Sequence, residues 1–155
     1  KASTDYGMRA ILYLAAQGTT CSSKDIAEDM SIPRYYLIQL AQLLRNAGII
    51  EARPGKHGGY RLAKDPAYTN VLEIMEALDD DAKQSTRAKR DARKGGAMVQ
   101  EIKQVYDLIE ESMDAYLSSL TVQMLLDCAR NGDNSRTFLA ERLQEESRRL
   151  LDAVK

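Results

Sequence analysis

The sequence is poor in the residue types that build many catalytic and metal sites. Among its 155 residues it has one histidine, His57, and two cysteines, Cys21 and Cys128, which lie far apart without paired spacing. This is neither the spacing of a disulfide framework nor that of a metal-binding knuckle. We also find no nucleophile motif and no paired carboxylate and histidine, so the sequence predicts a protein that is not an enzyme.

Long apolar runs are also absent. No stretch of about 18 apolar residues occurs, which excludes a membrane-spanning helix, and no signal-peptide pattern is found. Charged residues make up 29% and hydrophobic residues 44% of the chain, as is typical of globular proteins. We therefore expect a cytoplasmic protein.

The net charge of −1 hides an asymmetry along the chain. Residues 1–68 hold nine basic and six acidic residues, whereas residues 69–155 hold 13 basic and 17 acidic residues. A basic first part and an acidic second part indicate that the two parts have different partners.

Three helices are predicted at the beginning of the chain. The stretch 5–17 follows Thr4, a favourable N-cap, and has apolar residues at helical spacing. A shorter helix is expected at 23–30. A third follows at 32–46, with Pro33 in its first turn, where the missing N–H costs little. The last two form a helix-turn-helix pattern, although a plain pair of packed helices would have the same pattern.

A β-hairpin is predicted directly after this helix pair. Residues 49–53 and 60–63 alternate as strands do, and the glycine-rich segment 54–59 has the composition of a turn. A phosphate-binding P-loop is an alternative for such a segment, but the glycine and lysine spacing does not match, and a strand follows it. The order of elements is therefore that of a winged helix, with Lys56 and His57 near the tip of the wing.

Most of the chain resembles the IscR/NsrR/CymR-type (Rrf) family of bacterial winged helix-turn-helix transcription regulators. The G-x-x-G-G-Y-x-L motif of the wing is the most specific part of this resemblance. The matching segments are STDYGMRAILYLA (3–15), CSSKDIAEDMSIPRYYLIQLAQLLRNAGII (21–50), GKHGGYRLAKDP (55–66), TNVLEIMEALD (69–79) and YLSSLTVQMLL (116–126).

The resemblance implies a homodimer that binds a palindromic operator in double-stranded DNA and acts as a repressor. It implies a recognition helix at 32–46 in the major groove and a wing on the flanking minor groove. The DNA-binding residues that it indicates are Ser23, Lys24, Arg34, Tyr35, Tyr36, Gln39, Lys56, His57 and Arg61. For Tyr36, packing against Leu40 is an equally good interpretation.

The cleanest helical pattern lies at 97–120. Apolar residues there alternate in steps of three and four, which is the spacing of a coiled-coil seam, and the resemblance places an antiparallel dimer helix in this position. The seam residues are Val99, Ile102, Tyr106, Ile109, Met113, Tyr116 and Leu120. Thr121 is expected to cap a further short helix, and an amphipathic helix at 136–153 goes beyond the usual end of the family.

The segment 79–98 departs from the cluster-binding members of the family. Those relatives carry three cysteines here, whose thiolates hold an iron–sulfur cluster, whereas this segment has none. No cofactor is therefore expected in this chain, unless the alanines at 82, 88, 92 and 97 replace native cysteines. The six basic residues between 83 and 94 are typical of a solvated loop.

The sequence thus predicts a mainly α fold with a small β-hairpin. We expect a winged helix-turn-helix domain at 1–68, a linking helix and charged sensor-type loop at 69–96, and a dimerisation helix with C-terminal helices at 97–155. A winged-helix module that binds proteins rather than DNA remains the alternative function.

Overall fold

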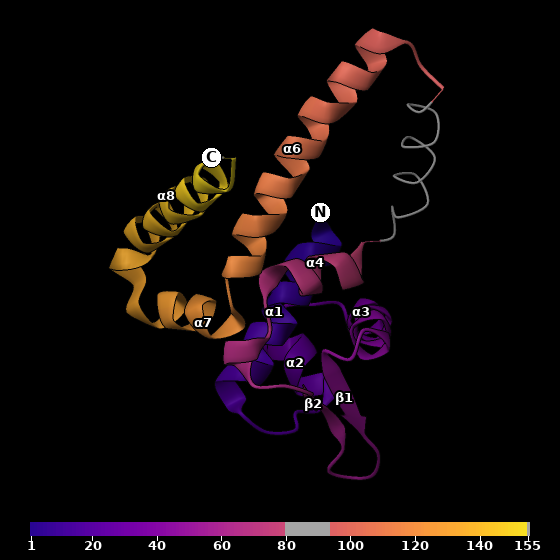
Figure 1. Cartoon of the computed structure of the whole chain (residues 1–155). Coiled ribbons are helices and arrows are strands. Elements are labelled where there is room, and N and C mark those ends of the chain that lie inside the picture. Colours follow the sequence, from indigo (N-terminus) through magenta and orange to yellow (C-terminus); the bar gives the residue numbers. More distant parts are fainter. Residues whose placement is uncertain (80–93, 155) are drawn as a thin grey trace.

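A computed structural model describes residues 1–79 and 94–154 of the chain. The fold is mainly α with one two-stranded antiparallel sheet, as predicted (Figure 1). In chain order the elements are α1 (Ala2–Gln17), α2 (Ser23–Asp29), α3 (Arg34–Asn46), β1 (Ile50–Arg53), β2 (Gly59–Leu62), η1 (Pro66–Tyr68), α4 (Val71–Leu78), α6 (Ala97–Ser119), α7 (Val122–Asn131), η2 (Gly132–Asn134) and α8 (Ser135–Val154).

The helix starts follow from local capping only in part. Ser22 caps α2, because its hydroxyl accepts a hydrogen bond of 3.0 Å from the backbone N–H of Asp25. Thr4, in contrast, was expected to cap the first helix but lies inside α1. Pro33 is the N-cap of α3 rather than a residue of its first turn. These two predictions of helix boundaries were therefore wrong by a few residues.

The hairpin is held to the helical part of the molecule at its base. In addition to the β1–β2 pairing, Cys21 and Tyr60 exchange two backbone hydrogen bonds of 2.8 Å. Gly59 stands next to this bridge with φ of 149°, and a Cβ there would collide with the carbonyl oxygen of Cys21. Only glycine allows this close approach of two backbones, which explains Gly59.

One core serves more elements than the sequence indicated. Ile11 of α1 and Leu37 of α3 are buried together with Ile74 of α4 and Val122 of α7. The core therefore extends past residue 68, which we had expected to be the end of the DNA-binding domain. The helix α4 packs against α1 and α3 in this core.

The starts of α4 and α7 are joined through their backbones. The N–H of Val71 donates to the carbonyl of Leu120, and the N–H of Val122 donates to the carbonyl of Thr69, both at 2.9 Å. Each start is also capped, by the side chains of Asn70 and Thr121. The C-terminal end of α6 is thereby tied to the helix-turn-helix domain.

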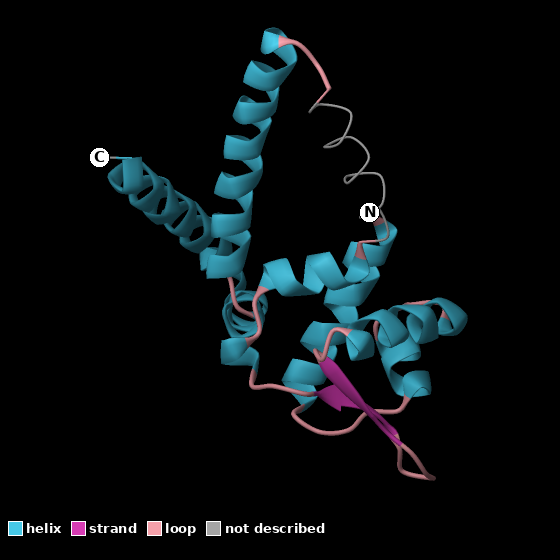
Figure 2. Ribbon diagram, turned by 45° about the vertical axis from the view of Figure 1, so that its right-hand side comes forward, coloured by secondary structure: helices cyan, strands magenta, loops and turns pink. Residues whose placement is uncertain are grey.

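From this connection α6 projects away from the rest of the molecule (Figures 1 and 2). Its base is flanked by α8, the helix expected at 136–153. In the described part of the chain, no helix is long and apolar enough to cross a membrane.

Candidate nucleic-acid interface

The helix α3 lies on the core with one face and presents the other to solvent. Leu37, Leu40, Ala41 and Leu44 are buried, because they follow the period of an amphipathic helix. Arg34, Tyr35 and Gln39 lie on the opposite side and are exposed. These three side chains are therefore accessible to a ligand in front of α3.

Tyr36 is placed differently from its neighbours. It is half-buried, and its ring meets the ring of Tyr6 on α1 edge to face, with 5.5 Å between the centroids. This geometry is typical of aromatic packing in a core. The sequence left two interpretations of Tyr36 open, contact with DNA and packing against Leu40. The structure favours packing, with Tyr6 as a partner in addition to the core around Leu40.

The first turn of α2 lies beside the first turn of α3. Arg34 donates two hydrogen bonds of 3.3 Å to the hydroxyl of Ser23, and the neighbouring Lys24 is exposed. The other end of α2 is held to α1, because the hydroxyl of Tyr13 donates to the Asp29 carboxylate at 2.7 Å. This bond raises the pKa of Tyr13 to about 12. At the first turn of α2, in contrast, the neighbouring side chains of Ser23, Lys24 and Arg34 form one polar group.

The wing presents its predicted residues in two environments. Lys56 and His57 are exposed in the turn between the strands. Arg61 lies on β2 opposite Glu51 of β1 and forms an ion pair with it at 2.9 Å. The sequence pattern did not distinguish these cases, because the partner of Arg61 is ten residues away and is brought close by the strand register.

The cations of the first 79 residues fall into two groups. Four of them, Lys1, Arg9, Arg61 and Lys64, each pair with a carboxylate, of Asp79, Asp5, Glu51 and Glu73 respectively. Five others form no ion pair with any described residue, and all five belong to α2, α3 or the hairpin: Lys24, Arg34, Arg45, Arg53 and Lys56. Figures 1 and 2 both show α3 and the hairpin at the end of the molecule away from α6. Residues 23–62, which span α2, α3 and the hairpin, hold six basic and four acidic residues, so this end carries a net positive charge.

Three residues of this surface were missed by the sequence analysis. Arg45 and Arg53 are exposed cations at the end of α3 and on β1. Ile38 is 47% exposed and follows Arg34 by one helical turn. The i, i+4 spacing from Arg34 could have identified Ile38, but an apolar residue at that position is more often assigned to a core.

Comparisons with known proteins agree with this geometry. The sequence profile of the Rrf2 family, described as "Iron-dependent Transcriptional regulator", matches residues 1–128. The chain belongs to the Rrf2 family. It is a member of a group of bacterial DNA-binding regulators of transcription with a helix-turn-helix.

Individual relatives are similar over most of their length. The HTH-type transcriptional regulator NsrR of Bacillus subtilis is 30% identical over 138 residues, which are 88% of this chain and 93% of that protein. Among solved structures, IscR of T. potens has a TM-score of 0.68 and 28% identity, covering 86% of this chain and 89% of its own. CymR of Staphylococcus aureus in its oxidised form has a TM-score of 0.61 and 26% identity, covering 81% and 94%.

In this Rrf2 member, the predicted seam lies on exposed surface over most of α6. Five of its residues are exposed: Val99, Ile102, Tyr106, Ile109 and Met113. Tyr116 is half-buried, and Leu120 is only 5% exposed because it packs inside its own chain. The end of the predicted seam at Leu120 therefore needs correction, and the free apolar face runs from Val99 to Met113.

The cysteines do not fit an iron–sulfur cluster of the kind that Rrf2 relatives bind. Cys21 is buried at the base of the hairpin, and its burial together with Asp25 raises the pKa of the thiol, which disfavours the thiolate that a metal requires. Cys128 lies on another helix, α7. In residues 1–79 and 94–154, no group of three His, Cys, Asp or Glu side chains could hold a metal ion. The alanines at 82, 88 and 92 lie outside the described residues.

Proposed function

We propose that this Rrf2 regulator binds a palindromic operator as a homodimer and represses transcription from it. The observation that carries the proposal is the set of five unpaired cations on α2, α3 and the hairpin. The other four cations of the first 79 residues pair with carboxylates. Cations left unpaired on one surface can neutralise DNA phosphates and release their counterions, which drives association with DNA.

Specific recognition is assigned to the exposed face of α3. Arg34 and Gln39 have the hydrogen-bonding groups that read base edges in the major groove. Ile38, between them on the same face, suits the methyl group of thymine. Lys56 and His57 on the wing would contact the backbone beside the adjacent minor groove, and Ser23 and Lys24 would position the helix pair on the phosphates.

Dimerisation is assigned to α6. Its exposed seam repeats in steps of three and four and has no partner within the described part of the chain. Such a stripe is stabilised by a second helix with the same pattern. An antiparallel pair of α6 helices would give the dimer a two-fold axis, which matches the symmetry of a palindromic operator.

Binding to promoter fragments of the source genome tests the proposal. We expect one subset of fragments to be retained at physiological salt, with affinity falling steeply as salt rises. A protein-binding winged helix would retain no fragment even at low salt. Sedimentation equilibrium of the free protein tests the dimer separately, because a monomer at micromolar concentration would contradict the role of α6 without affecting the assignment of α3.

A further inference from the structure

The apolar surface of α6 is wider than a two-helix seam requires. Met98, Val105 and Leu108 are 57% to 67% exposed, although none of them belongs to the seam from Val99 to Met113. They recur after seven and three residues and therefore form a second stripe beside the seam. An antiparallel α6 pair alone would leave this second stripe in water.

The same second stripe changes character toward the C-terminal end of α6. Continuing in steps of four and three, it reaches Ser112, Ala115 and Ser119, all of which are small. Ala115 and Ser119 are half-buried, and α8 of the same chain lies against these turns. Small side chains allow this close approach, so one end of the stripe is built to receive α8.

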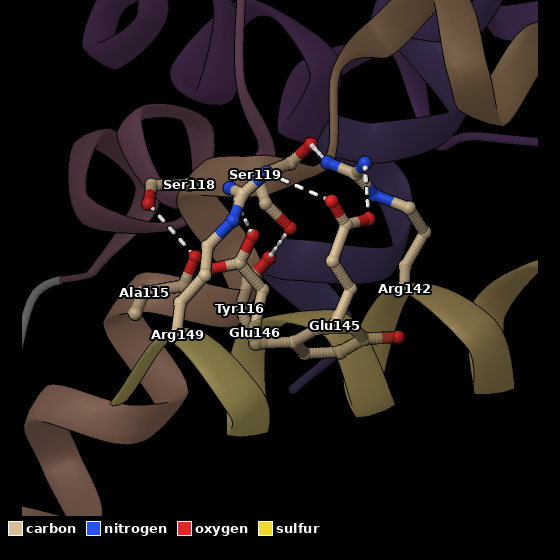
Figure 3. Close-up of polar contacts among 8 residues, drawn as sticks. All are labelled: Ala115, Tyr116, Ser118, Ser119, Arg142, Glu145, Glu146 and Arg149. Atoms are coloured by element: carbon tan, nitrogen blue, oxygen red, sulfur yellow. Dashed lines mark hydrogen bonds and ion pairs between the residues drawn. The ribbon is translucent and has the colours of Figure 1, made fainter. Parts of the chain in front are cut away.

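Polar contacts fix α8 at this end of α6 (Figure 3). Arg142 donates a hydrogen bond of 3.0 Å to the carbonyl of Ser119, where the last carbonyls of the helix attract a cation. On the same side of α8, Glu146 is buried and pairs with Arg149 at 2.9 Å. Figures 1 and 2 show α8 starting beside the base of α6 and running opposite to it in direction, and Figure 2 shows that the C-terminal end of α8 diverges from α6.

A different side of α8 carries small and apolar residues and is mostly exposed, although Leu150 is half-buried. Ala140, Leu143, Ser147 and Leu150 are spaced by three, four and three residues, as in a helix seam. Leu143 is 49% exposed and Leu151, next to this row, is 66% exposed. Since Arg142 and Glu146 face α6, the exposed part of this row has no partner within the described part of the chain.

We propose that α8 of each protomer docks on the N-terminal part of the partner's α6, covering Met98 and Val105. The proposal rests on the antiparallel α6 dimer proposed above. A two-fold axis perpendicular to the plane of the two α6 helices exchanges them and reverses their direction. A helix that lies above this plane in one protomer therefore lies above it in the other protomer as well. Each α8, which flanks the C-terminal end of its own α6, then lies beside the N-terminal end of the partner's second stripe.

The spacing on the two helices supports this pairing. In the dimer, α8 runs in the same direction as the partner's α6, because both run opposite to its own α6. Leu143 and Leu150 are seven residues apart, as are Met98 and Val105. The two apolar rows therefore match in length and direction, and the dimer contains four packed helices in which a second copy of the chain covers α8.

Disulfide trapping between two different variants tests this contact. In a Cys128→Ser background, Met98→Cys protein is mixed with Leu143→Cys protein under subunit exchange and mild oxidation. We expect a covalent dimer containing one chain of each kind. Glu141→Cys is the matched control, because it lies two residues away on the other side of α8 and should not be trapped by Met98→Cys.

The outcomes separate this proposal from the α6 dimer itself. If sedimentation shows a dimer but Leu143→Cys is trapped no better than Glu141→Cys, the position of α8 is wrong and the α6 dimer stands. If sedimentation shows only monomers, the α6 dimer fails and the α8 contact fails with it. As a second measurement, Leu143→Asp should raise the dimer dissociation constant by about tenfold or more. Gln144→Asp, an exposed position that gains the same charge, should leave it unchanged.

Discussion

Removing the charge of Lys56 should change how DNA affinity depends on salt. Each phosphate neutralised by a cation contributes a slope of about −0.9 to the logarithm of affinity against the logarithm of salt concentration. With five unpaired cations in each protomer, a dimer that engages all of them would have a slope of roughly −9. Lys56→Ala removes one contact from each protomer, and the slope should therefore fall in magnitude by about 2.

Fluorescence anisotropy with a labelled operator fragment at several salt concentrations measures this slope. Lys64→Gln is the control, since Lys64 is ion-paired with Glu73 at 2.9 Å and is expected to contact no phosphate. An unchanged slope for Lys56→Ala would remove the wing tip from the DNA contact. An equal loss in both variants would refute the division of cations into paired and unpaired groups, because overall charge alone would then explain binding.

Three further predictions concern the wing base, α2 and α6. Gly59→Ala should lower the unfolding free energy by about 2 kcal/mol or more, because its Cβ would collide with a backbone carbonyl. Gly55 has a positive φ but open space around it, so Gly55→Ala should lower the unfolding free energy by only about 1 kcal/mol. Equal losses of unfolding free energy for the two variants in denaturant titrations would contradict this difference. Tyr13 should titrate at about 12 by ultraviolet absorbance, so that the stabilising bond to Asp29 is intact below the usual tyrosine pKa and is lost as pH rises through 12; an Asp29→Asn variant that titrates at the same pH would argue against this cause. Ile109→Asp should give monomers with little operator binding, and a dimer of unchanged mass in sedimentation would contradict the seam.

Much of the fold could be predicted because its signals are local. Thr121 caps α7 as expected, and Ser22 caps α2 in the same way, since both caps depend on a backbone N–H three residues away. The hairpin was predicted from its glycine-rich turn and alternating flanks. The family of the chain was also predicted from its motifs, and the match over residues 1–128 confirms it.

The errors concern contacts between residues that are far apart in the sequence. Nothing local shows that Val122 completes the core around Ile11, or that Leu120 is buried in its own chain rather than at a dimer seam. Arg61 was grouped with Lys56 because both are cations of the wing, and only the strand register brings Glu51 beside Arg61. Burial and ion pairing of this kind depend on packing between elements. The hydrophobic periodicity of one segment does not show which other segment packs against it.

The backbone hydrogen bonds that join the starts of α4 and α7 make α6 and the helix-turn-helix domain move together. With 23 residues, α6 is about 35 Å long. Because its base is fastened to the core by the bonds at Val71 and Val122, the domain must follow any change in its direction. If the angle between two α6 helices changed by about ten degrees, a recognition helix would move by roughly 6 Å. This displacement is about a sixth of the spacing of roughly 34 Å between two operator half-sites. The angle between two α6 helices would thus decide whether both halves of an operator can be read at once.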